Sequence, residues 1–197
     1  MLVLASGSSG RRALLENAGI PHGVMIASVD EEAARLTFRA EGLGPRDLAD
    51  ALAELKARKV SAKCPTDLVL GCDQTLALDD GTMFDKAESR AMLAEQLRQL
   101  SGKTHSLFSA MVVAEQGQPV WRHVERVRLT MRALSDGFIA DYLESEGDAL
   151  LGCVGGYRIE GPGAQLFSAI DGSHFAIVGL PLLPLLDYLR TREILVT

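Results

Sequence analysis

The chain has 197 residues, of which 47% are hydrophobic and 23% are charged, so it can bury an ordinary core and is too apolar to be disordered. It carries 20 Lys and Arg residues against 26 Asp and Glu residues, which gives a net charge of −6. This acidic balance argues against nucleic acid as a partner, although a nucleotide is compatible with a few local cations.

The cysteines and the apolar runs indicate a cytoplasmic protein. Three cysteines cannot all pair with one another and none forms a C-x-x-C motif, which fits a reducing compartment and gives no zinc site. The longest apolar run, residues 176–186, contains two prolines and is shorter than the roughly 20 residues that a membrane span needs. The first residues place a basic pair after a short apolar stretch, the reverse of a secretory signal. We therefore expect a soluble cytoplasmic protein with no membrane partner.

Short apolar runs and helical periodicity alternate along the whole chain. Apolar runs bounded by glycine, serine or proline are typical of buried strands, whereas leucine and alanine stripes at helical spacing indicate helices. Strands are expected over residues 2–5, 23–27, 68–72, 75–78, 104–114 and 120–131 and near 165–170. Helices are expected over residues 11–18, 45–62, 87–100 and 135–143 and from about residue 181. The pattern predicts one α/β domain, residues 1–197, with a mixed sheet that contains a long hairpin.

The segment Ser6-Gly7-Ser8-Ser9-Gly10-Arg11-Arg12 lies between the first expected strand and the first expected helix. Small residues let a ligand approach the backbone, the start of the helix offers free N–H groups, and the arginine pair adds positive charge. These properties fit a phosphate cradle. A flexible turn with a solvated arginine pair has about equal weight on spacing alone, because phosphate loops follow stricter patterns.

Asp73 follows the continuous apolar run Leu68–Cys72 and is expected at the end of a buried strand. Ligands of α/β proteins bind near the carboxyl ends of strands, and a carboxylate there can hold Mg²⁺ or take a proton from water. A turn-initiating aspartate is the alternative. Another apolar run follows Asp73 instead of glycine or proline, and this favours a functional role.

Three further charged residues are candidates through their surroundings. Lys56 lies on the alanine-rich helix and Lys86 follows a turn, and each alone is more often a solvated surface charge. They gain significance if the fold directs them to the same cavity as the arginine pair. Glu160 lies in a segment with five glycines, residues 152–163, that fits no G-x-G-x-x-G pattern. It is either a carboxylate that accepts hydrogen bonds from a ligand or a surface glutamate.

Five segments, in order along nearly the whole chain, resemble the Maf-like nucleotide pyrophosphatases, a family also called septum-formation inhibitor Maf. They are Leu4-Ala5-Ser6-Gly7-Ser8 with Arg11, Val29-Asp30-Glu31, Gly71-Cys72-Asp73-Gln74, Leu100-Ser101-Gly102-Lys103-Thr104-His105 and Val178-Gly179-Leu180-Pro181-Leu182. The resemblance implies hydrolysis of a nucleoside triphosphate to the monophosphate and pyrophosphate with a divalent cation, Mg²⁺ or Mn²⁺. It also implies a Maf/ITPase-like fold, in which a twisted mixed β-sheet flanked by helices forms two lobes around a central cleft, and a homodimer.

The resemblance also implies roles for individual residues. Asp73 matches the family's catalytic acid, and Glu31 matches an acid near the metal. Arg12 adjoins the first motif at a position where some branches lack a cation. The expected site therefore has Asp73 and Lys86 as catalytic residues, Asp73 and Glu31 at the metal, and Ser8, Gly10, Arg11, Arg12, Lys56, Gln74 and Glu160 at the substrate.

The expected mechanism depends on positioning and charge. We expect the metal, held by Asp73 with Glu31 close, to bridge triphosphate oxygens and position water at the α-phosphorus, with Asp73 or a metal-bound hydroxide as the base. Arg11, Lys56 and Lys86 would neutralise the charge of the leaving pyrophosphate. A carboxylate among phosphates is repelled unless a cation intervenes, so the residues themselves argue for the metal.

Residues that differ between branches of the family bear on the substrate. Asp73-Gln74 and Glu160-Gly161 look like the 7-methyl-GTP branch rather than the dTTP/UTP branch, although Gly10 stands where the former has a bulky aromatic residue. Glu160 and Gln74 are expected to contact the base, since a carboxylate accepts two N–H donors from a guanine edge and favours a cationic methylated ring. The expected substrate is 7-methyl-GTP or another modified nucleotide. Hydrolysis of dTTP and UTP, or regulation of cell division by a nucleotide-binding protein without turnover, are the alternatives.

Overall fold

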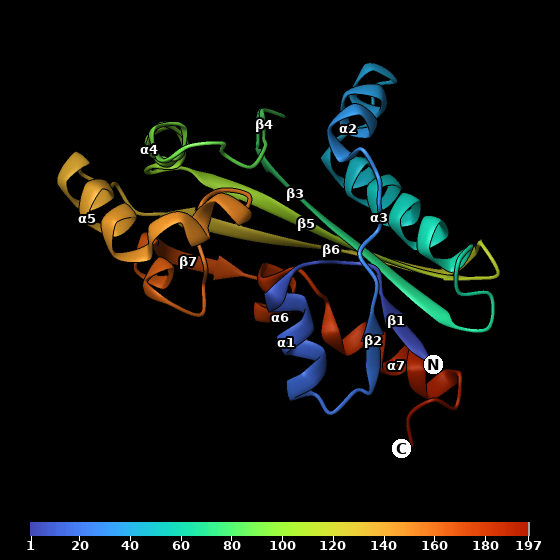
Figure 1. The fold of residues 1–197 in the computed structure, drawn as a ribbon. Helices are drawn as coiled ribbons and strands as arrows, with labels where there is room; N and C mark the ends of the chain where they lie inside the picture. Colours follow the sequence, from blue (N-terminus) through green and yellow to red (C-terminus); the bar gives the residue numbers. More distant parts are fainter. Residues whose placement is uncertain (197) are drawn as a thin grey trace.

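A twisted, mixed seven-stranded sheet organises the protein, whose computed structural model describes residues 1–196 (Figure 1). The strands are β1 (Leu2–Leu4), β2 (His22–Val24), β3 (Leu68–Leu78), β4 (Met83–Phe84), β5 (Thr104–Glu115), β6 (Gln118–Met131) and β7 (Phe167–Asp171). Their order is β2-β1-β3-β5-β6-β7, and β4 pairs with the carboxyl end of β3. β1 runs parallel to β2 and β3, and the other pairs are antiparallel. The predicted α/β class with a mixed sheet flanked by helices is confirmed.

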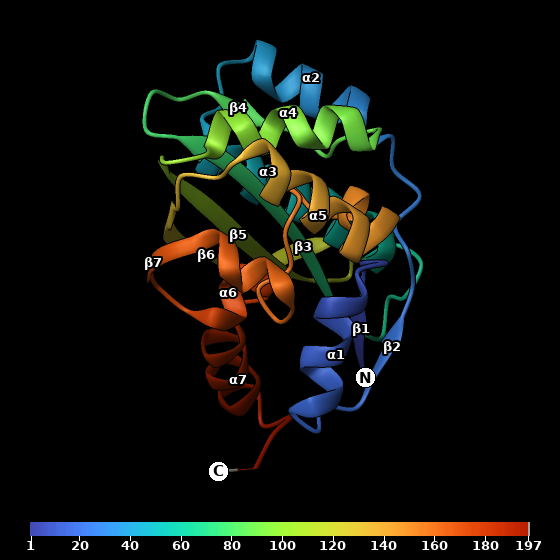
Figure 2. The ribbon, with the colours of Figure 1, turned by 90° about the vertical axis from the view of Figure 1, so that its left-hand side faces the viewer.

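Helices cover both faces of the sheet (Figure 1). They are α1 (Ser9–Asn17), α2 (Glu31–Ala40), α3 (Pro45–Ser61), α4 (Arg90–Leu100), α5 (Asp136–Glu146), α6 (His174–Val178) and α7 (Leu182–Thr191), with short 3-10 helices η1 (Gly147–Gly152) and η2 (Pro162–Leu166). α3 packs on one face of β3 and β5, and α1 and α7 pack on the opposite face. Figure 2 shows α2 and α4 at the end of the molecule opposite α7 and both chain termini. Within residues 1–196, no helix combines the length and apolar character that crossing a bilayer requires.

The structure differs from the sequence-based expectation in four elements. Residues 75–78 do not form a strand of their own, because β3 continues without a break from Leu68 to Leu78. β2 ends at Val24, earlier than expected. The helices α2 and α6 are not among the predicted ones: α2 has no buried residue, and α6 has only five residues.

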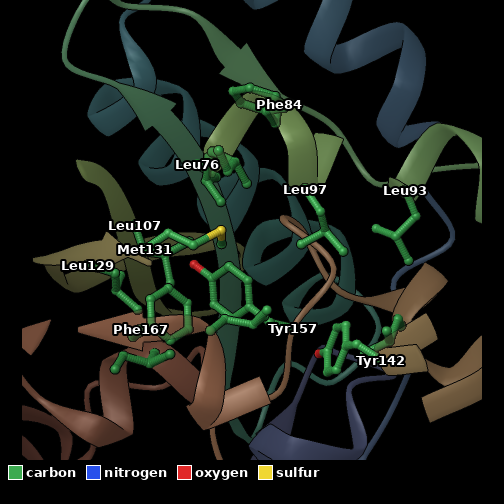
Figure 3. Close-up of a cluster of buried hydrophobic side chains, with 14 of the residues drawn as sticks. Leu76, Phe84, Leu93, Leu97, Leu107, Leu129, Met131, Tyr142, Tyr157 and Phe167 are labelled. Carbon is green, nitrogen blue, oxygen red and sulfur yellow. The ribbon is translucent and has the colours of Figure 1, made fainter. Parts of the chain in front are cut away.

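The apolar core consists of separate clusters, and β3 takes part in the two largest. One of them contains the side chains labelled in Figure 3, which are Leu76, Phe84, Leu93, Leu97, Leu107, Leu129, Met131, Tyr142, Tyr157 and Phe167. The second lies between the sheet and the helices α1 and α7 and includes Leu4, Leu15, Leu70, Cys72, Met111 and Leu185. Between Cys72 and Leu76, β3 carries three polar residues, Asp73, Gln74 and Thr75. A polar segment of β3 therefore lies between two apolar clusters. The expected cleft between two lobes stays a prediction.

The contact between α3 and β3 depends on a glycine. A Cβ atom at Gly71 would lie 2.6 Å from the backbone nitrogen of Ala57 and still closer to the carbonyl oxygen of Ala53. Real Cβ atoms do not approach backbone this closely, so only glycine lets the helix lie this near the strand. Asp73 is two residues further along β3, so its side chain points to the same face of the sheet, toward α3. The glycine therefore sets the distance at which α3 faces Asp73.

We predict that Gly71→Ala destabilises the protein by about 2–3 kcal/mol, because the added methyl group meets backbone atoms that cannot rotate away. Urea unfolding would measure the loss. Gly137→Ala is the matched control, since a Cβ at Gly137 in α5 meets only the tip of the Ser135 side chain, at 4.0 Å. Its effect should stay within about 1 kcal/mol. Equal stability of the Gly71→Ala variant and the wild type would contradict the close packing.

Candidate active site

Asp73 lies in the middle of β3, and the expectation that it ends a strand is wrong in that detail. The last residue pair between the parallel strands β1 and β3 is Leu4 with Leu70, whereas β3 continues to Leu78. Asp73 is therefore three residues beyond the point at which its neighbour stops. It lies beside the carboxyl end of β1, where ligands bind in α/β sheets, although it does not end its own strand.

A buried ion-pair cluster surrounds Asp73. The Lys56 Nζ lies 2.7 Å from Asp73 Oδ1 and 2.8 Å from Glu31 Oε2. Lys56 and Asp73 are only 6% and 5% exposed, whereas Glu31, in the first turn of α2, is half-exposed. Lys56 shares one face of α3 with Ala53 and Ala57, so the close contact at Gly71 brings it to Asp73. Because burying a lone charge is very unfavourable, the lysine and the aspartate depend on each other.

The charges of this cluster act on the ionisation of Glu31. Partial burial raises the pKa of the Glu31 carboxyl, but the hydrogen bond and charge of Lys56 and the charges of Lys86 and Arg35 outweigh it. The net result is a pKa below its ordinary value of 4.5. Glu31 is therefore ionised at neutral pH, and the two lysines and the arginine lie close enough to affect it.

The second carboxylate oxygen of Asp73 fits a metal ion. Asp73 Oδ2 is buried and has no hydrogen-bond partner. Residues 1–196 contain no group of three or more His, Cys, Asp or Glu side chains that could enclose a metal. Mg²⁺ commonly binds through one or two carboxylates together with substrate phosphates instead of an all-protein cage. Asp73 and Glu31 fit that donor set, as expected for Mg²⁺ or Mn²⁺ that binds together with a triphosphate.

Arg11 connects the loop after β1 to the rest of the site. Its Nε donates to the carbonyl oxygen of Gly179 at 2.8 Å, and its Nη1 donates to Ser6 Oγ at 3.1 Å and to the carbonyl oxygen of Cys72 at 3.0 Å. β1 pairs with β3 only as far as Leu70, so β1 offers no backbone donor to the carbonyl oxygen of Cys72. Arg11 supplies that hydrogen bond instead. Ser8 caps α1 by accepting a bond from the Arg11 backbone nitrogen. Arg11 is thus a buried connection between the loop, β3 and α6.

Three expected substrate residues are directed away from Asp73. Arg12 is exposed on α1 and forms an ion pair with Glu16 one turn further on, so the structure does not bring it to the cluster. The amide nitrogen of Gln74, on the opposite face of β3 from Asp73, lies 2.7 Å from Ser109 Oγ and 2.9 Å from the carbonyl oxygen of Ala176. Gln74 thus positions α6 against β5. Gly10 faces α6 as well, since a Cβ there would lie 2.9 Å from Val178 Cγ1.

Lys86 and Glu160 are far apart in the sequence, and the charges of both act on the same residue, Cys153. Lys86 is exposed just after β4, and Glu160 is exposed in the loop before η2. Burial raises the pKa of the Cys153 thiol, the charge of Glu160 raises it further, and the charge of Lys86 opposes this rise. A buried bond of 2.8 Å between the Tyr157 hydroxyl and His105 Nε2 holds the loop that carries Glu160. Burial lowers the pKa of His105 to about 4, so this histidine is neutral at pH 7.

Sequence reasoning missed Arg35 of α2, which lies next to Asp73, and the ion pairs between α2 and the segment after β4. Arg35 Nη2 lies 3.6 Å from Asp73 Oδ2, and Arg35 Nε lies 3.5 Å from Asp85 Oδ1. Arg39 binds the same Asp85 carboxylate with two bonds of 2.8 Å. The missed signal was Asp30, which caps α2, followed by two glutamates in the first turn. Once the helix is recognised, Arg35 falls on the same face as Glu31, one turn later.

The fold and the site define an α/β protein with a buried carboxylate, suited to a divalent cation, among several side-chain cations. The chain belongs to the Maf-like protein family, whose model matches residues 1–192. It is 55% identical to a nucleoside triphosphate pyrophosphatase of Hyphomonas neptunium, over 100% of this chain and 98% of the relative. It is 50% identical to a 7-methyl-GTP pyrophosphatase of Brucella abortus, over 98% of this chain and 96% of the relative. The predicted family and enzyme class, a nucleoside triphosphate pyrophosphatase that hydrolyses an acid anhydride, are confirmed.

We predict that Glu31→Gln makes stability less dependent on acidic pH. The lowered pKa of Glu31 means that its ionised form stabilises the fold above about pH 4.5, and that this contribution is lost as the pH falls through the folded-state pKa. Urea unfolding of the wild type and the variant between about pH 7 and pH 3 would show a smaller loss for the variant. Glu32→Gln, in the same turn of α2, is the control and should follow the wild-type curve. Parallel curves for the wild type and Glu31→Gln would contradict the Lys56 pairing.

Proposed function

We propose that this pyrophosphatase acts on 7-methyl-GTP or a closely related modified purine nucleoside triphosphate. The observation that carries the chemistry is the buried Asp73 carboxylate, which has one oxygen on Lys56 and one oxygen free of hydrogen bonds. Lys56 and Lys86 reach this place from different elements. The name of the Brucella abortus relative and the Glu160-Gly161 pair support the choice of base.

In the proposed reaction, a water oxygen attacks the α-phosphorus and the bond from this phosphorus to the bridging oxygen breaks, so that pyrophosphate leaves. Asp73 Oδ2 takes the proton of the water or holds the divalent cation, and both roles use the same unbonded oxygen. The cation, bound by Asp73 with Glu31 close, would supply Lewis-acid stabilisation of the phosphate charge. Lys56 and Lys86 neutralise the charge that builds on the leaving group. Arg11 acts indirectly, by fixing the loop after β1.

We assign the base to the loop that carries Glu160. This glutamate is exposed, and the buried Tyr157–His105 bond holds the loop at its base. The charges of Glu160 and of Lys86, the proposed phosphate-binding lysine, both act on the pKa of the Cys153 thiol, which supports a base contact in the same part of the site. A negative carboxylate favours a guanine edge with two N–H donors and a positively charged methylated ring. The cytoplasmic location and the homodimer stay predictions from the sequence.

Replacement of Asp73 separates an enzyme from a binding protein without turnover. We expect the wild type with Mg²⁺ or Mn²⁺ to release pyrophosphate from nucleoside triphosphates, and Asp73→Asn to lower the rate by on the order of 10³-fold. Nucleotide binding, measured by calorimetry, should remain largely intact, and circular dichroism would confirm that the variant is folded. A wild type that binds nucleotides without releasing pyrophosphate would instead support the regulator. Full activity of Asp73→Asn would refute the role of the carboxylate.

Glu160→Gln tests the choice of base. Across a panel of ordinary and methylated nucleoside triphosphates, the variant should lose about tenfold or more in the kcat/KM preference for 7-methyl-GTP over dTTP and UTP, since a charge-assisted contact is lost. Pyrophosphate release gives the readout for each substrate. Glu144→Gln is the control, because Glu144 is exposed on α5. An unchanged order of substrates in the Glu160→Gln variant would show that this residue does not read the base.

A further inference from the structure

Arg35 has a partly buried side chain whose guanidinium receives no hydrogen-bond partner from the protein within residues 1–196. Its side chain is 19% exposed, and its two nearest carboxylates, Asp73 and Asp85, lie 3.6 and 3.5 Å away. Neither contact is a hydrogen bond, and no hydrogen bond of residues 1–196 has the Arg35 side chain as its donor. A guanidinium has five N–H donors in a fixed plane, so the N–H groups of Arg35 are free to donate hydrogen bonds to a ligand.

The neighbours of Arg35 are already satisfied by other residues. Asp85 receives two bonds of 2.8 Å from Arg39, and Asp73 Oδ1 receives its bond from Lys56. The hydrogen bonds to both carboxylates therefore come from residues other than Arg35. The N–H groups of Arg35 lie beside Asp73 without a protein acceptor, and an anionic ligand that enters there would accept their hydrogen bonds.

We propose that Arg35 binds a phosphate group of the nucleoside triphosphate and is a substrate-binding residue of this enzyme. The inference rests on the proposed function, since it takes the triphosphate as the anion. A planar guanidinium matches two phosphate oxygens at once, which a lysine cannot do. Arg35 Nη2 lies 3.6 Å from Asp73 Oδ2, so a divalent cation held by that oxygen would repel the guanidinium, and Arg35 would turn from the carboxylate to the phosphates that accompany the cation.

A purely structural role for Arg35 makes a different prediction. No residue of α2 is buried, so ion pairs to its neighbours contribute to holding this helix. Arg39 forms the shorter and geometrically better pair with Asp85 on the same helix. If Arg35 only held α2 in place, removal of Arg39 should disturb the site at least as much as removal of Arg35.

The test compares three variants with the wild type, Arg35→Gln, Arg35→Lys and the control Arg39→Gln. Inorganic tripolyphosphate in Mg²⁺ is the probe, and calorimetry measures its affinity, which depends on neither the base nor turnover. We expect Arg35→Gln to weaken binding by about 10- to 100-fold, Arg35→Lys to recover part of the loss, and Arg39→Gln to change it by less than about threefold. KM for the nucleotide should rise in parallel. Circular dichroism checks the fold of each variant, and if Arg35→Gln does not fold, the loss in Arg35→Lys decides.

Two results would overturn the proposal. Wild-type affinity for tripolyphosphate in the folded Arg35 variants would show that the guanidinium does not touch phosphate. An equal loss in Arg39→Gln would show that Arg35 acts through the position of α2. The proposed function can fail separately: a wild type that hydrolyses no triphosphate but binds tripolyphosphate through Arg35 would refute the reaction and retain the site.

Discussion

The site depends on the contact between the backbone of α3 and the backbone of β3 at Gly71. With two alanines on the helix and a glycine on the strand, the only side-chain atoms that these three residues place between the backbones are alanine methyl groups. The residue beside those alanines on the helix face is Lys56, and the next residue on that face of the strand is Asp73, so a lysine and an aspartate meet with both almost fully buried. A larger residue at the contact would hold the two charges apart and admit water between them. Packing of small residues therefore controls the electrostatics of the site.

The position of Asp73 between two apolar clusters adds to this control. Apolar residues before and after the polar segment of β3 belong to different parts of the core, so the strand is fixed on both sides of the carboxylate. The low polarity of these surroundings strengthens every charge interaction at the site and makes an unpaired oxygen unfavourable. Asp73 Oδ2 is such an oxygen. In the proposed function this oxygen would hold the cation, and charges that are fixed before the substrate arrives contribute most to phosphoryl chemistry.

The sequence predicted which residues form the site better than it predicted the strand ends and contacts that position them. Apolar runs and helical stripes predicted α3 and the β5–β6 hairpin, and the motifs singled out Asp73, Lys56 and Glu31, which the structure brings together. The relative lengths of neighbouring strands could not be predicted, because the end of β1 beside a continuing β3 depends on pairing between distant segments. The same limit applies to Gln74. Alternation places it opposite Asp73, but only the folded chain shows that α6 accepts its hydrogen bonds.

The helix α2 shows a different limit of sequence reasoning. None of its residues is buried, whereas its charged side chains pair with Asp73 and Asp85, so an analysis that looks for buried apolar stripes does not identify Arg35. Charged helices of this kind are recognisable by their caps, here Asp30, but the partners of their charges are set by tertiary structure. We expect residues that bind a polyanion to be charged side chains with weak ion pairs, since they must leave a carboxylate partner when the polyanion binds.

The balance of charges explains why cation and triphosphate suit this site only together. Without ligands, the carboxylates of Glu31 and Asp73 share Lys56, and Arg35 stands near Asp73. A divalent cation alone would take the carboxylates of Glu31 and Asp73 and leave Lys56 as an unpaired buried charge, while Arg35 would keep only Asp85. A triphosphate alone would attract these cations but would face two bare carboxylates. Under the proposed function both bind, the carboxylates would turn to the metal and the side-chain cations to the phosphates, and each charge would exchange one partner for another.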